Sequence, residues 1–172
     1  DLICSRNTTG LFQIGSNTYK QRMRRLNPRN IEQLADCLAL VRGPCIQSGL
    51  DESYMKIQEG SETIKLVHPI YDEITASTNG IMIYQEQIMF LCAKLGLSLY
   101  DGYVVVKAGA KKKKDVLKKY EDKLWDLAKD KMDKETFDYM FKLILDSAKY
   151  SFNKSHATSY ALLTYVTAYY KT

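Results

Sequence analysis

Apolar residues recur at intervals of three and four along most of the chain, the spacing that places them on one face of an α-helix. The clearest stretches follow Asn30, which can cap a helix over 31–41, and Asp133, which can cap a helix whose apolar residues run from 137 to 148. Further helices are predicted over 20–26, 51–59, 81–95, 115–128 and from 157 onward. We therefore expect a mainly α fold of about six or seven helices, with irregular connections and little or no sheet.

Two segments between these helices carry weaker signals. Residues 64–67 form a short apolar run that suits an extended segment, and His68-Pro69 is expected to resist helix formation. Residues 98–107 are expected to be helical or irregular, because the run from Val104 to Val106 favours β structure.

The stretch from Ser151 to Thr172 begins with a polar loop and continues as a predicted helix. Asn153 or Ser155 can cap this helix by accepting from the free N–H groups of its first turn. One predicted face is small and can lie close to a neighbour: Ala157, Ala161, Thr164 and Ala168. The face beside it is bulky: Tyr160, Leu163, Val166 and Tyr170. Lys154 and His156 lie where a helix N-terminus attracts anions, although an ordinary cap with a surface lysine explains the same residues.

Composition supports a folded domain and leaves its partner open. The chain has 172 residues, is 45% hydrophobic and carries a formal net charge of +5, which is compatible with a polyanionic partner without establishing one. The four cysteines, Cys4, Cys37, Cys45 and Cys92, are scattered and form no CxxC pair, so free buried thiols in a reducing cytosol are favoured over a zinc site. No apolar run approaches the length of a membrane span, and we expect a cytoplasmic protein without membrane contact.

Two segments are strongly basic. Lys20, Arg22, Arg24 and Arg25 alternate with Tyr19, Met23 and Leu26, which on a helix gives a basic side and an apolar side. Lys107 precedes an unbroken run from Lys111 to Lys114. The basic side chains of each segment could contact phosphates, and they are equally compatible with a helix face that is simply exposed to solvent.

Three motifs carry a resemblance to a known family. Residues 152–157 read FNKSHA, with Tyr160-Ala161 and Thr167-Ala168-Tyr169 further on. His68-Pro69 is followed over 78–89 by TNGIMIYQEQIM, and residues 9–13 read TGLFQ. In this order and spacing they resemble the fingers region of the bacterial replicative DNA polymerase III alpha subunit (C family), including divergent or phage-borne members.

The resemblance implies a function for the larger protein. Residues 1–172 would be the fingers, an irregular multi-helix subdomain, of a template-directed DNA polymerase, a nucleotidyltransferase of DNA replication. The family's catalytic aspartates and their Mg²⁺ belong to the palm, which precedes this segment. We therefore expect no catalytic residue, metal ligand or cofactor here, and no activity of the isolated chain. Because it starts at Asp1 rather than Met, we also expect an excised fragment.

The resemblance also implies partners and site residues. The partners would be primer–template DNA, a deoxynucleotide triphosphate, other polymerase domains and replisome subunits. The expected nucleotide-binding residues are Lys107, Lys111, Lys112, Asn153, Lys154, Ser155, His156, Tyr84 and Gln85. The expected DNA-binding residues are Lys20, Arg22, Arg24, Arg25, Arg42, Lys113 and Lys114. Lysines 107, 111 and 112 are expected to converge with Lys154 and His156 on one triphosphate pocket, with the small face of the last helix packed on the 84–89 helix.

The chain departs from the family pattern at several positions. Gly15 replaces an acidic residue, residues 43–45 replace the family's Pro-Gly-Pro, and Ala110 replaces a glycine before the lysines. Val106 replaces an arginine, which removes a bidentate phosphate contact that lysine does not fully reproduce. The sequence therefore leaves two alternatives open: a non-catalytic helical nucleic-acid-binding module, and a purely structural helical domain.

Overall fold

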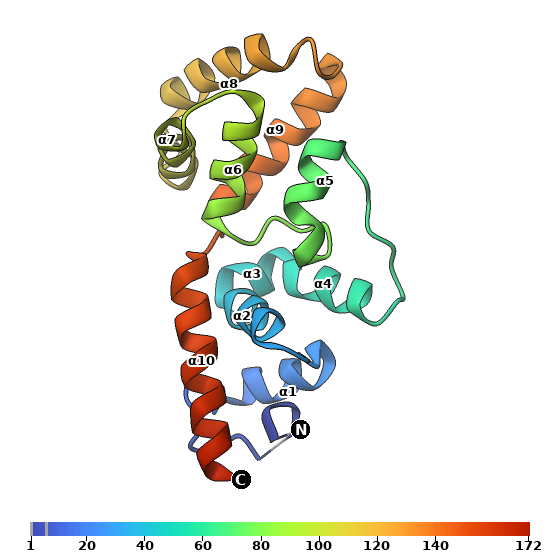
Figure 1. Cartoon of the computed structure of the whole chain (residues 1–172), viewed down its shortest axis with the longest axis vertical. Helices are drawn as coiled ribbons and strands as arrows, with labels where there is room; N and C mark the ends of the chain where they lie inside the picture. The colour runs from blue at the N-terminus through green and yellow to red at the C-terminus, as the bar shows by residue number, and fades with distance from the viewer. Residues whose placement is uncertain (1, 6) are drawn as a thin grey trace. The chain divides into compact units, whose positions relative to one another are not determined.

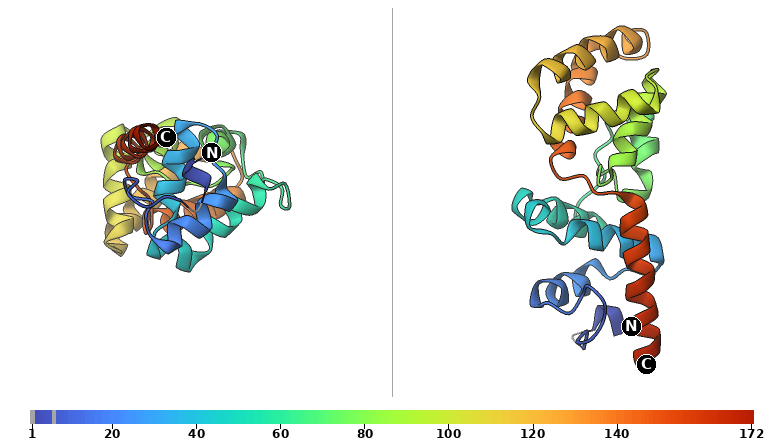
Figure 2. Two further views of the ribbon diagram at one scale, coloured as in Figure 1. Left: turned by 90° about the horizontal axis from the view of Figure 1, so that it is seen from below. Right: turned by 90° about the vertical axis from the view of Figure 1, so that its left-hand side faces the viewer.

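The computed structural model describes residues 2–5 and 7–172 (Figures 1 and 2). The backbone divides into two compact units: Asp1–Thr63 with Phe152–Thr172, and Ile64–Ser151. We call them unit 1 and unit 2. The described residues form ten α-helices and two short 3-10 helices and make no sheet, which confirms the mainly α prediction.

The number of helices exceeds the expected six or seven because short or weakly predicted segments also form helices. The sequence between Arg42 and Gly49 forms a short helix, and Pro69 opens another instead of preventing it. Proline is tolerated at the first helical position, where its missing N–H would have no partner in any case. The valine run lies inside a helix because Val105 and Val106 are fully buried, and this packing outweighs their β preference.

Unit 1 contains η1 (Leu2–Cys4), α1 (Asn17–Leu26), α2 (Ile31–Leu40), α3 (Gly43–Ser48), α4 (Leu50–Gln58) and α10 (Lys154–Lys171). The small face of α10 is buried as predicted, and α10 packs along α2. The expected packing of this face on the helix at 84–89 stays a prediction. Thr164 Oγ1 and Thr167 Oγ1 also hold the loop before α1, bonding to Phe12 O (3.2 Å) and Phe12 N (3.1 Å).

Unit 2 contains α5 (Pro69–Thr75), η2 (Ala76–Thr78), α6 (Gln85–Leu95), α7 (Leu99–Ala110), α8 (Lys114–Ala128) and α9 (Lys134–Ala148). Residues 81–84, expected to be helical, precede α6 in extended or turn conformation. Side chains from α6 to α9 share one hydrophobic core, and α6 and α7 pack closely along each other. This core fixes the end of α7 and the start of α8, where the lysine run lies.

The predicted helix caps at Asn30 and Asp133 are confirmed. Asn30 Oδ1 accepts from Gln33 N at 2.8 Å, and Asp133 Oδ1 accepts from Thr136 N at 2.8 Å. Of the two candidates at the last helix, Asn153 is the residue at the N-cap position and caps α10. These three helices therefore begin where their sequence signals place them.

The four cysteines are free thiols, and three of them are buried. Burial raises the pKa of the Cys92 thiol to about 12 and raises the pKa of Cys37 as well. Such thiols stay protonated at neutral pH and are poor metal ligands. None of the described helices combines the length and apolar character that crossing a membrane requires.

A hydrogen-bonded carboxylate joins α7 to α8 and gives a pH-dependent prediction. Asp101 accepts from Tyr120 Oη at 2.8 Å and from Ser98 Oγ at 3.0 Å, and these bonds hold its pKa at about 2. Since the folded pKa lies below the ordinary value, this stabilisation is present above pH 4 and is lost as the pH falls toward about 2. We expect Tyr120→Phe to raise the Asp101 pKa, measured by NMR titration of the carboxyl carbon. An unchanged pKa would show that Tyr120 does not set it.

Candidate nucleotide and nucleic-acid interface

The start of α10 presents a rigid, exposed turn. Asn153 Oδ1 accepts from His156 N at 2.8 Å and from Ser155 Oγ at 2.6 Å, which fixes the loop that precedes the helix. Asn153, Lys154, Ser155 and His156 are all exposed. The positive end of the helix dipole and the Lys154 ammonium therefore face solvent together, an arrangement that favours an anion.

A row of aromatic rings holds the His156 imidazole in place. Its ring centroid lies 4.0 Å from that of Tyr160 and 5.4 Å from that of Phe152. Tyr160 in turn meets Phe12 edge to face at 5.1 Å. His156 is thus fixed between two rings, so its exposed edge has a defined position at the helix start.

Arg42 closes the other end of this row. Its guanidinium carbon lies 4.3 Å from the centre of the Phe152 ring, and its Nε donates to Ala39 O at 2.6 Å. Arg42 therefore supports the FNKSHA turn from α2's end. Its expected contact with DNA stays a prediction.

The lysine run forms the connection between α7 and α8 in unit 2. Lys111 ends α7, Lys112 has a positive φ of 53°, and α8 begins at Lys114. Lys107 and all four lysines of the run are exposed, and none of them is ion-paired with an acidic side chain within the described residues. Their charges therefore stay available to an anion from outside the unit.

The departure at Val106 has a structural explanation in this chain. Val106 is fully buried in the core of unit 2, one turn before the lysine run. A side chain at this position serves packing and cannot reach a ligand on the surface. Phosphate contact from this end of α7 is therefore left to Lys107 and the lysine run.

The YQEQ segment divides into supporting and accessible residues. Tyr84 is 1% exposed and Gln87 is 6% exposed, whereas Gln85 is partly exposed. Gln85 Nε2 makes a long contact of 3.5 Å with Ser151 O. Of the two expected nucleotide-binding residues here, Gln85 alone is at the surface; both assignments stay predictions.

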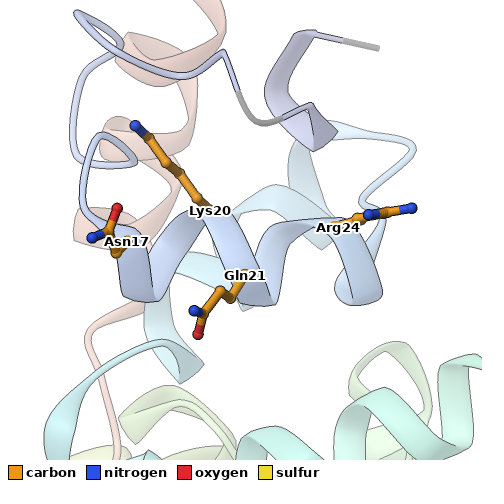
Figure 3. A pocket seen from close by; sticks show the side chains of 4 residues that line it. All are labelled: Asn17, Lys20, Gln21 and Arg24. Atoms are coloured by element: carbon orange, nitrogen blue, oxygen red, sulfur yellow. The ribbon is translucent and has the colours of Figure 1, made fainter.

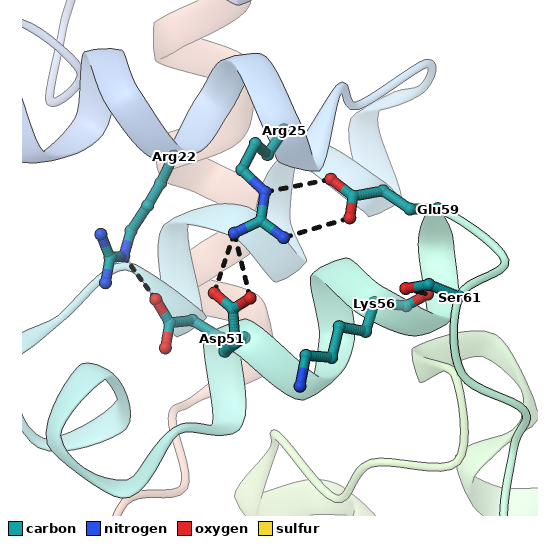
Figure 4. A network of polar contacts seen from close by, with 7 residues as sticks. Arg22, Arg25, Asp51, Lys56, Glu59 and Ser61 are labelled. Carbon is teal, nitrogen blue, oxygen red and sulfur yellow. Dashed lines mark hydrogen bonds and ion pairs between the residues drawn. The ribbon is translucent and has the colours of Figure 1, made fainter.

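The basic residues of α1 fall into two groups. Arg22 is ion-paired with the buried Asp51, and Arg25 binds Glu52 (2.9 Å) and Glu59 (3.0 Å) on or just after α4 (Figure 4). We call these five residues the clasp. The opposite group lines a hollow of about 420 Å³ on the solvent side of α1 (Figure 3): Asn17, Lys20, Gln21 and Arg24. We call these four residues the donor face.

The structure brings some of the expected site residues together within each unit. In unit 1 it gathers the start of α10 with Arg42 through Phe152, and in unit 2 it gathers Lys107 with the lysine run. The convergence of these two groups on one pocket stays a prediction. The sequence did not reveal Phe152, Tyr160 and Phe12 as supports of His156; the spacing of residues 152, 156 and 160 carries that signal, but the contact with residue 12 depends on the fold.

Comparison with known proteins identifies the family. Residues 1–132 match the bacterial DNA polymerase III alpha subunit finger domain. The chain is 34% identical to a DNA polymerase III subunit alpha of Halalkalibacterium halodurans and 35% identical to that of Thermotoga maritima, in each case over 99% of this chain. It is also 34% identical to an error-prone DNA polymerase of Bdellovibrio bacteriovorus over 99% of this chain. The chain spans 15%, 19% and 17% of the length of these three relatives, respectively. With more than half of its length matched by the family model, the chain belongs to the bacterial DNA polymerase III alpha subunit finger-domain family.

Proposed function

We propose that this chain binds the incoming deoxynucleotide triphosphate and the primer–template DNA as part of a template-directed DNA polymerase. Its membership in the finger-domain family is the observation that carries this proposal. The complete enzyme would join a deoxynucleotide to a primer 3′ end and release pyrophosphate. Replisome subunits and other polymerase domains would be its protein partners, and the cytoplasm its location.

Each unit offers one group of candidate phosphate-binding side chains to the triphosphate. Lys107, Lys111 and Lys112 come from the end of α7, and Lys154 and His156 come from the start of α10. Exposed cations and an N-terminal helix turn are both suited to phosphate oxygens. Tyr84 and Gln85 would shape the wall of the site, with Gln85 nearer to the ligand.

The Mg²⁺ that such a polymerase uses would be held elsewhere in a longer protein. Among the described residues, no three His, Cys, Asp or Glu side chains gather as a metal site would require. Phosphoryl transfer of this kind needs carboxylates that hold the metal ions. We propose that this chain binds and positions the phosphates.

Lys154→Ala within the complete polymerase tests this proposal. Loss of one charge-assisted phosphate contact is expected to raise the KM for the nucleotide about 10-fold or more, because such a bond contributes about 1.5–3 kcal/mol. Affinity for primer–template should change less, measured by fluorescence anisotropy. Lys56→Ala is the matched control, since Lys56 is an exposed lysine of α4 outside the expected site.

The opposite result would favour one of the alternatives. If Lys154→Ala weakens DNA binding and leaves nucleotide use unchanged, the α10 turn belongs to a DNA-binding surface. If neither quantity changes relative to Lys56→Ala, the turn has a structural role only.

A further inference from the structure

The ten residues of α1 contain four cations and no acidic residue. On sequence alone the four cations were equivalent candidates for contact with DNA. The fold makes them unequal, because α1 presents two different sides to α4 and to solvent. Which side binds DNA can therefore be argued from the pairing of each cation.

The clasp uses two of the cations to fasten α1 to α4. Asp51 is 1% exposed, and its ion pair with Arg22 compensates a carboxylate that burial would otherwise leave unsatisfied. Arg25 is bonded through Nε, Nη1 and Nη2 to Glu52 and Glu59. With these carboxylates in contact, the local charge of Arg22 and Arg25 is offset, and releasing either arginine to a phosphate would break existing bonds.

The donor face has the opposite character. Its members occur at i, i+3, i+4 and i+7, which places them on one side of the helix. Each carries hydrogen-bond donors, and neither Lys20 nor Arg24 is ion-paired with an acidic side chain in the part of the chain that the structure describes. The buried residues Met23 and Leu26 hold the other side of α1 in the unit.

The arrangement of the donors indicates the shape of the ligand. Residues 17 to 24 extend over about 10 Å of helix at 1.5 Å per residue. Figure 3 shows the side chains of Lys20 and Gln21 spreading apart as they leave this face, with Arg24 further along the helix. Donors that are spread in this way fit an extended polyanion better than the compact triphosphate of one nucleotide.

We propose that the donor face binds the phosphodiester backbone of the DNA, with Lys20 and Arg24 each neutralising one phosphate, and that the clasp positions α1 without contacting DNA. This inference rests on the proposed function, because it assigns part of the DNA contact to named residues. Asn17 and Gln21 donate neutral hydrogen bonds to the same strand, a contact that fixes register and carries no base specificity.

The test compares two adjacent arginines of the same helix. Arg24→Ala and Arg25→Ala remove the same charge from exposed positions, and each is assayed for binding to a primer–template between about 50 and 400 mM salt. Arg24→Ala is expected to reduce the slope of log affinity against log salt by about 0.9, and Lys20→Ala with Arg24→Ala by about 1.8. Arg25→Ala is expected to leave the slope within about 0.2 of the parent value.

A second measurement addresses the clasp. Arg22→Ala is expected to lower the midpoint of thermal unfolding by roughly 5–10 °C, whereas Arg24→Ala leaves it nearly unchanged.

A third measurement repeats the salt titration with the template strand alone as the probe. Each phosphate contact that a substitution removes is then expected to reduce the slope of log affinity against log salt by about 0.7, which distinguishes single-stranded from duplex binding.

The outcomes separate this inference from the proposed function. Equal slope changes for Arg24→Ala and Arg25→Ala would overturn the division of α1 into two sides. Salt-dependent binding that is unchanged by Lys20→Ala with Arg24→Ala would overturn the donor face and leave DNA binding to the lysine run. No binding of primer–template by the parent chain would overturn the DNA-binding part of the proposed function itself.

Discussion

Replacing Gln87 by alanine is expected to lower the free energy of unfolding by about 3–5 kcal/mol, although the residue touches no ligand in the proposed site. Its Oε1 accepts from Ile83 N at 2.8 Å and Tyr84 N at 2.9 Å. Its Nε2 donates to Thr78 Oγ1 at 2.8 Å and Ile74 O at 3.2 Å. Alanine would leave several buried polar groups without partners at once, and each such group costs about 1–3 kcal/mol.

The expected loss concerns the segment that leads into α6. Gln87 ties α5 and η2 to the first turn of α6, and its Oε1 accepts from two backbone N–H groups just before that helix. Urea unfolding followed by circular dichroism measures the change. Gln87→Met keeps most of the side-chain volume and removes the hydrogen bonds, so it separates the polar contribution from a cavity effect.

The neighbouring glutamine of the same motif is the control. Gln85 is partly exposed and makes one long contact, so Gln85→Ala is expected to change stability by less than about 0.5 kcal/mol. If Gln87→Met is as stable as the parent chain, the hydrogen bonds are not what holds this segment. If Gln85→Ala and Gln87→Ala lower the free energy of unfolding equally, our inference that burial makes Gln87 the more important of the two residues is wrong.

The YQEQ motif also shows what the sequence could and could not predict. Tyr84 and Gln85 were both expected to bind nucleotide, and the structure buries Tyr84 while it leaves Gln85 partly exposed. The sequence did not distinguish the glutamine that faces the core from the one that faces solvent. That difference depends on α5 and η2, which approach Gln87 only in the folded unit.

Local signals in this chain predicted local structure well. Caps at Asn30, Asp133 and Asn153 lie where expected, because capping depends on residues within one turn. The small face of α10 was also correct, whereas its packing along α2 was not foreseen, since helix pairing depends on residues far apart in the sequence. For the same reason the acidic partners of Arg22 and Arg25, about 30 positions away, could not be predicted from the α1 sequence.

Val106 illustrates a limit of comparing motifs position by position. The replacement of an arginine suggested a weakened phosphate contact. In this fold the valine is part of the core, so the exposed lysines that follow it carry any phosphate contact from this end of α7. The charge of a motif can therefore be kept on neighbouring residues while one position changes from polar to apolar.

A side chain at Gly102 is expected to be strongly destabilising, with Gly102→Val lowering the free energy of unfolding by about 3 kcal/mol. A Cβ at this position would lie 2.9 Å from Met89 Cα and 3.1 Å from Met89 O. Both atoms belong to the backbone of α6, so no change of side-chain rotamer can relieve the overlap. The replacement gains less than about 0.5 kcal/mol of helix propensity, because valine is a weaker helix former than alanine, and this offsets only a small part of the cost.

Three variants examine whether the close approach of α6 and α7 is the cause. Gly43→Ala is the control, because nothing lies within 4 Å of a Cβ at Gly43, and it should be neutral or slightly stabilising. Met89→Ala combined with Gly102→Ala should show no rescue, since truncating Met89 leaves its Cα and O in place. A double variant as stable as Met89→Ala alone would show that the side chain, not the backbone, limits the space.

The same close approach connects packing with the proposed function. α7 ends in the lysine run, so separating α7 from α6 would displace Lys107 and Lys111 relative to the rest of unit 2. Gly102→Ala, which is expected to cost about 1–2 kcal/mol and leave the chain folded, should therefore raise the KM for the nucleotide in the complete polymerase. The KM should change while the salt slope for DNA binding at the donor face does not, because α1 belongs to unit 1. An unchanged KM together with the expected loss of stability would show that the lysines tolerate the displacement, and would weaken their assignment to the triphosphate.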